Sequence, residues 1–115
     1  LNNDDKNRIL KKVIKLVKEE KYFLNSNASL TSLSKIINEK HHSVSQVINE
    51  KLNMAFYELI ANYRIEEAKK ILKTKKGKQI TIEQVSEMVG YNSKSTFNTT
   101  FKKITGSTPS TYRDS

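Results

Sequence analysis

The 115-residue sequence contains no cysteine, one proline and three glycines. Without cysteine it has no disulfide bonds and no thiolate metal site, which fits a reducing compartment. Few helix breakers in a chain full of Lys, Glu, Ile and Leu predict an all-α fold. No apolar run is long enough to span a bilayer and no signal peptide is recognisable, so we expect a cytoplasmic segment without membrane contact.

The charge is strongly unbalanced. There are 21 Lys and Arg against 12 Asp and Glu, which gives a formal net charge of +9. Such a balance indicates a polyanionic partner, more often nucleic acid than an anionic membrane, with a generally lysine-rich surface as the alternative. The length fits one domain or two small lobes that share a connecting helix. Because the chain begins with Leu1 rather than Met, we expect it to be part of a larger protein.

Residues 80–113 have the pattern of two short helices joined by a tight turn. Thr81 and Gln84 form a capping box, which predicts that the first helix begins at Ile82. Gly90 stands where the turn requires a positive φ. The apolar stripe of this helix is Ile82, Val85 and Val89.

The second helix of this segment has one apolar and one polar face. Ser93 is a suitable N-cap. The residues expected to be buried are Phe97, Phe101 and Ile104. The opposite face carries Ser95, Asn98, Thr99 and Lys102. Short donors and acceptors with a lysine on one face suit the DNA major groove, so the pair of helices is predicted to be a helix-turn-helix.

The same pattern occurs earlier in the chain. Residues 29–34 parallel residues 81–86 at an offset of 52, and Ile37-Asn38 falls on Val89-Gly90. After the turn the offset becomes 53, so that Val44 and Ile48 match the two buried phenylalanines. The matching outward face is His42, Ser45, Gln46 and Asn49. A repeat that preserves both faces predicts two helix-turn-helix units.

Two further helices complete the expected architecture of about seven. Residues 4–24 carry apolar side chains at helical spacing, namely Ile9, Val13, Leu16 and Val17. Residues 55–73 contain no breaker and form a linker helix of about 25–30 Å. We therefore expect a first lobe over about 4–52 and a second over about 80–115, in a single domain spanning 1–115. The basic loop 73–78 is either a solvated linker or a DNA contact.

The chain from about residue 30 to 113 resembles the DNA-binding domain of AraC/XylS-family bacterial transcription regulators. The matching segments are Tyr63–Ala68, Ile82–Tyr91, Phe97, Phe101–Lys103 and Gly106–Arg113. The resemblance implies two helix-turn-helix lobes on one linker helix that bind double-stranded DNA in adjacent major grooves. Such a domain is usually the C-terminal part of a larger regulator.

The resemblance also implies which side chains contact DNA. Carried over by position, the base-reading residues are His42, Ser45, Gln46, Lys94, Ser95, Thr96 and Thr99. Exposed helix N-termini and late positions on the recognition helices are expected to contact phosphates. These are Ser29, Leu30, Asn49, Thr81, Ile82, Asn98, Lys102 and Lys103.

Several positions depart from the family pattern. Asn38 and Asn53 replace glycines, which a left-handed Asn tolerates. Lys40 replaces a capping serine, so the first recognition helix is expected to start late or fray. Gln46 and Thr99 stand where many members have arginine. We therefore expect less arginine-type discrimination of guanine and more dependence on phosphates and DNA shape.

Other classes of function receive little support. His41 and His42 lack a third ligand, and Glu83 and Glu87 lack a catalytic partner, so we expect no metal, no cofactor and no enzyme activity. One alternative is non-specific binding of DNA or RNA. The other is a protein-interaction module that docks RNA polymerase or a dimer partner. Arg64 fits the family pattern, as does Arg113, but both could instead form ion pairs with nearby acids, namely Glu66, Glu67 and Asp114.

Overall fold

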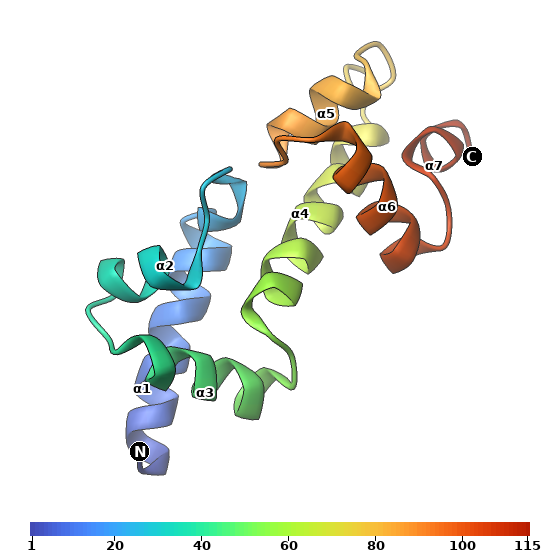
Figure 1. Ribbon diagram of the computed structural model, residues 1–115. Helices are drawn as coiled ribbons and strands as arrows, with labels where there is room; N and C mark the ends of the chain where they lie inside the picture. The colour runs from blue at the N-terminus through green and yellow to red at the C-terminus, as the bar shows by residue number, and fades with distance from the viewer.

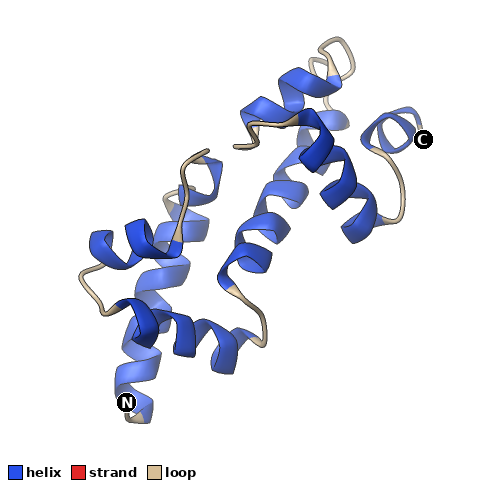
Figure 2. Cartoon of the chain, viewed as in Figure 1, coloured by secondary structure: helices blue, strands red, loops and turns tan.

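The computed structural model describes residues 1–115, and it contains helices and loops but no strand (Figure 2). The predicted all-α class and the seven α-helices are confirmed. The molecule is elongated, with extents of 48 × 23 × 22 Å. The helices are α1 (Asn3–Ile14), α2 (Leu30–Ile36), α3 (His41–Leu52), α4 (Phe56–Leu72), α5 (Ile82–Met88), α6 (Lys94–Thr105) and α7 (Pro109–Asp114).

Helix α4 joins two separate hydrophobic cores. Leu59 and Ile60, near its N-terminus, pack into the core formed with α1, α2 and α3. Ile65, Ala68 and Leu72 pack into the core formed with α5 and α6. Figure 1 shows α4 running from one lobe to the other, with the two chain termini on different lobes. The predicted linker helix is confirmed, and its side chains belong to both lobes.

The internal repeat is exact in its helix boundaries. Helices α2 and α5 both have 7 residues and start 52 positions apart. Helices α3 and α6 both have 12 residues and start 53 positions apart. The intervening turns contain Asn38 at φ 56° and Gly90 at φ 99°, so asparagine takes the left-handed conformation as predicted. The two helix-turn-helix units are therefore built alike.

The first helix is shorter than the predicted range 4–24. Helix α1 continues as a π-helical turn over Lys15–Glu19, and the chain then breaks at Lys21, whose φ is 55°. A 3-10 turn, Tyr22–Leu24, follows the break. It buries Tyr22 and Phe23, and the phenol of Tyr22 both accepts from the N–H of Ser29 (3.1 Å) and donates to its carbonyl (3.2 Å). The aromatic pair reaches the core only because the helix stops.

One predicted core residue is exposed. Ile104 retains 40% of its accessible surface, whereas Phe97 and Phe101 are fully buried. The ring of Tyr112 from α7 packs edge-on against Phe101, with centroids 5.5 Å apart. Since α7 supplies the next layer of this core, Ile104 lies at its margin. Its side chain instead lines a shallow surface pocket with Tyr57.

Candidate nucleic-acid interface

Helix α6 presents a row of uncommitted polar side chains. Ser93 caps it by accepting the N–H of Thr96 at 3.3 Å, which confirms the predicted cap. Phe97 and Phe101 face the core, and most of the remaining positions of the helix are exposed to solvent. The side chains of the exposed residues form no hydrogen bond within the chain, and these residues are Lys94, Ser95, Thr96, Thr99, Lys102 and Lys103. Asn98 is half-buried beside them.

Helix α3 is the counterpart of α6 in the first lobe, but more of its polar side chains form hydrogen bonds within the chain. His42 is exposed, whereas Ser45 and Gln46 are half-buried. The amide of Gln46 donates to Glu50 at 3.1 Å, and the amide of Asn49 donates to the Ser45 carbonyl at 2.9 Å. Glu50 also pairs with Lys6 of α1 at 2.7 Å. The predicted base-reading residues thus lie together on this helix, but Gln46 already has a partner.

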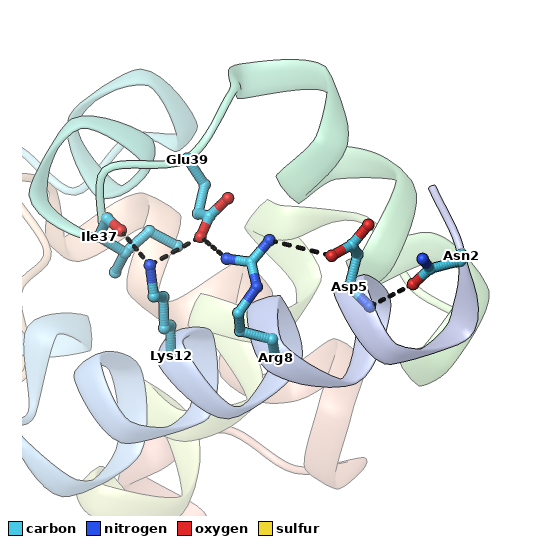
Figure 3. A network of polar contacts seen from close by, with 6 residues as sticks. All are labelled: Asn2, Asp5, Arg8, Lys12, Ile37 and Glu39. Carbon is cyan, nitrogen blue, oxygen red and sulfur yellow. Dashed lines mark hydrogen bonds and ion pairs between the residues drawn. The ribbon is translucent and has the colours of Figure 1, made fainter.

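The turn of the first helix-turn-helix is held by α1. Lys12 donates to the carbonyl of Ile37 (3.0 Å) and to the carboxylate of Glu39 (2.7 Å), and Arg8 pairs with the same carboxylate (Figure 3). The hydrogen bond from Lys12, together with the one from Arg8, lowers the pKa of Glu39 below its ordinary value. This network fixes the residue that precedes the N-cap.

The predicted late start of α3 is wrong. Lys40 occupies the N-cap without a side-chain hydrogen bond, as expected, but the helix still begins at His41. His41 is the repeat counterpart of Lys94, the first residue of α6. Glu39, the residue before the N-cap, is anchored to α1 by Lys12 and Arg8.

The N-termini of α2 and α5 retain free backbone donors. Ser29 accepts the N–H of Ser32 at 3.0 Å, and Thr81 with Gln84 forms the predicted capping box. These caps leave the N–H groups of the first two residues of each helix for an outside acceptor. The side chains of Leu30 and Ile82 pack inward, so any contact they make with phosphate would come from the backbone.

Two arginines have structural partners that the sequence did not indicate. Arg64 donates to the carbonyls of Phe23 (2.7 Å) and Asn25 (2.8 Å), and its guanidinium carbon lies 4.8 Å from the centroid of the Tyr91 ring. Arg113 donates to the carbonyl of Ile80 at 2.6 Å. The alternative of ion pairs with neighbouring acids is therefore wrong for both. Backbone acceptors in loops carry no residue-type signal, so sequence patterns could not reveal them.

The Arg64 side chain is partly buried from solvent. Burial lowers the pKa of its guanidinium, and burial likewise raises the pKa of the Tyr91 phenol. An arginine in a folded protein keeps its charge despite such a shift. The site therefore holds a partly desolvated cation against an aromatic face and two carbonyl oxygens.

No group of three or more His, Cys, Asp or Glu side chains is arranged to hold a metal ion. None of the helices combines the length and the apolar character that crossing a membrane requires.

Comparison with known proteins places the fold. A family model described as "Helix-turn-helix domain" matches residues 33–115. The C-terminal domain of AraT, a response regulator from Geobacillus stearothermophilus, is 29% identical with a TM-score of 0.81, over 92% of this chain and 84% of that one. The search of curated proteins gives no match.

More distant structures share the same fold. The C-terminal domain of the two-component response regulator yesN from Fusobacterium nucleatum is 24% identical, with a TM-score of 0.76 over 96% of this chain and 99% of the other. An AraC-type transcriptional regulator from Chromobacterium violaceum is 15% identical, with a TM-score of 0.79 over 97% and 95% of the two chains. At these identities the similarity concerns the fold.

Proposed function

Because this chain belongs to the AraC-type helix-turn-helix domains of transcription regulators, we propose that it binds specific double-stranded DNA sequences with its two lobes in adjacent major grooves. The observation that carries this proposal is the exposed polar face of α6, repeated on α3 at the same helix position. A solvent-facing helix backed by a rigid core is what entry into a major groove requires.

In the second lobe the proposed contacts divide by chemistry. Hydroxyls of Ser95, Thr96 and Thr99 can donate to or accept from base edges, and Lys94 can reach guanine acceptors. Lys102 and Lys103 lie late on α6, where a helix entering the groove by its N-terminus meets the phosphate backbone. The first-turn N–H groups of α5 add donors to the same backbone.

In the first lobe Gln46 is the principal proposed reader, with His42 and Ser45 beside it. A glutamine amide pairs in two places with adenine. To do so Gln46 exchanges its bond to Glu50 for the base, so part of the gain is offset. The first lobe is therefore proposed to discriminate less strongly than the second. Asn49 and the N-terminus of α2 are its proposed phosphate contacts.

The proposal includes a cellular setting. A domain that regulates transcription works where bacterial DNA is, so we place it in the cytoplasm, as part of a larger regulator. RNA polymerase is the further partner we propose.

Selection from a random duplex library tests sequence specificity. We expect enrichment of one motif, and binding to it at least ~10³-fold tighter than to random competitor at the same salt. Equal affinity for the selected duplex, for random DNA and for RNA would support non-specific nucleic-acid binding instead. Failure to bind any duplex would favour a protein-interaction module.

Salt dependence tests the phosphate contacts. If about six phosphates are neutralised, the logarithm of the association constant should fall with the logarithm of salt concentration at a slope near −5. The measurement is fluorescence-anisotropy titration of the selected duplex over a range of salt concentrations. A slope indistinguishable from zero would contradict phosphate-dominated binding.

Single substitutions test the division of roles. Gln46→Ala and Ser95→Ala should relax base preference at separate positions of the motif, with a cost of about 1–3 kcal/mol for a lost bidentate pair and less for the hydroxyl. Lys103→Ala should weaken all sequences alike. Affinities for a panel of single-base variants give both quantities. A panel in which Lys103 alone controls base preference would refute these roles.

A further inference from the structure

The two lobes meet directly, in addition to their connection through α4. The loop that precedes α2 approaches the turn between α5 and α6 beside the middle of α4 (Figure 1). At Gly90 in that turn, a Cβ atom would lie 2.9 Å from the carbonyl oxygen of Leu24 and 3.0 Å from that of Phe23. Leu24 packs against both hydrophobic cores. The backbone of the second helix-turn-helix therefore rests on the backbone of the first lobe.

Arg64 occupies the centre of this contact. Its side chain leaves α4 between the residues of the two cores, after Ile60 and before Ile65. One side of the guanidinium donates to first-lobe carbonyls, at Phe23 and Asn25, while its face covers the ring of Tyr91 from the second lobe. A planar fork with fixed donor directions holds three partners in one relative position, which a lysine ammonium does not.

A helix alone would not hold the lobes this firmly. α4 resists bending, yet the core of each lobe packs on a different half of it, so small rocking about the helix would remain possible. The second point of contact, at Arg64 and Gly90, removes that freedom because it lies away from the helix axis.

We propose that Arg64 is a positioning residue, which fixes the angle between the lobes and thereby sets the half-site spacing that the protein accepts. The consequence for DNA rests on the proposed function, whereas the clamp itself does not. Arg64 is assigned no contact with DNA. Its effect passes through the placement of α6 relative to α3.

Arg113 provides the matched control. It too donates to a backbone carbonyl, that of Ile80, but both groups belong to the second lobe. The substitution Arg113→Gln removes this hydrogen bond and leaves the contact between the lobes intact. If losing an arginine–carbonyl hydrogen bond lowers protein stability in general, both Arg64→Gln and Arg113→Gln should show it. A change in the angle between the lobes should occur only in Arg64→Gln.

The first test uses the protein alone. Since the chain has no cysteine, Asn7→Cys and Glu87→Cys, both at exposed helix positions, give one spin label on each lobe. Pulsed electron paramagnetic resonance should give a narrow distance distribution in the parent. We expect Arg64→Gln to broaden it about twofold, Arg64→Lys to broaden it less, and Arg113→Gln to leave it unchanged.

Folding controls keep this test decisive. Each variant is first melted, and Arg64→Lys replaces Arg64→Gln if the latter does not fold. A distribution as narrow in a folded Arg64 variant as in the parent would overturn the clamp, and so would equal broadening in Arg113→Gln.

The second test uses the selected duplex and a version with 2 bp inserted between its half-sites. The insertion rotates one half-site by about 70°. We expect the parent and Arg113→Gln to lose about 100-fold in affinity, and Arg64→Gln to lose measurably less, by at least about threefold. Equal losses in all three proteins would overturn the role in spacing even if the labels show broadening. If no protein prefers the selected duplex over random DNA, the proposed function fails, and the label distances still decide the clamp.

Discussion

Replacement of Phe101 by alanine is expected to reduce the free energy of unfolding by about 3–5 kcal/mol. Phe101 is fully buried, and its ring lies 5.7 Å from that of Phe97 and 5.5 Å from that of Tyr112. Removal of the ring leaves a cavity in the smaller core beside the rings of Phe97 and Tyr112. Small domains have only about 5–15 kcal/mol in total, so this loss is a large part of the stability.

Chemical denaturation followed by circular dichroism measures the effect. Ile104→Ala is the matched control, because Ile104 is three residues further along α6 and 40% exposed. We expect it to cost less than about 1 kcal/mol. Equal losses in the two variants would mean that α6 is rotated from the orientation described here, and its polar face with it.

The repeated units were predictable because their signals are local. Thr81 with Gln84, and Ser93, are side-chain caps whose effect depends on residues three positions away. Asn38 and Gly90 mark turns through backbone conformation. Apolar spacing then gave the buried faces, correctly at Phe97 and Phe101, and incorrectly only at Ile104, where the boundary of the core depends on α7.

Features that depend on distant residues were not predictable. The break at Lys21 serves to bury Tyr22 and Phe23 in a core completed by α4, and nothing in the local pattern marks it. The contact that anchors Glu39, just before α3, joins it to Lys12, 27 positions away. Hydrophobic periodicity contains no information about either contact.

The sequence predicted which helix faces carry the polar residues of the candidate interface, but not which of these side chains already have hydrogen-bond partners. The polar positions of α3 and α6 follow from helical phase and the family pattern. That Gln46 is bonded to Glu50, while Ser95 and Thr99 are free, follows from side-chain geometry alone. The role of Arg64 between the lobes likewise depends on loop carbonyls, which any residue type supplies.

Insertion of 5 bp between the half-sites of the selected duplex is expected to reduce specific affinity by at least about 100-fold. The insertion turns one major groove to the opposite side of the duplex, since half-sites on one face are about 10–10.5 bp apart. Helix α4 has 17 residues, a length of about 25 Å, and contains no Gly or Pro. The second lobe cannot follow its half-site around the duplex, so one lobe must dissociate.

Insertion of a full turn should not restore binding. The two grooves then face the same side again, but their separation grows by about 34 Å, more than the length of α4. The duplex with a full turn inserted (+10) therefore distinguishes two cases. A rigid two-lobe protein should bind it weakly, whereas a protein with a flexible joint should recover affinity because the grooves face the same side again.

A gel-shift titration of the parent, +5 and +10 duplexes at one salt concentration tests the two-lobe mechanism most directly. Under this mechanism we expect tight binding to the parent and a fall towards single-lobe affinity on both altered duplexes. Equal binding to all three would contradict it, because it would mean that the joint is flexible or that only one lobe recognises DNA.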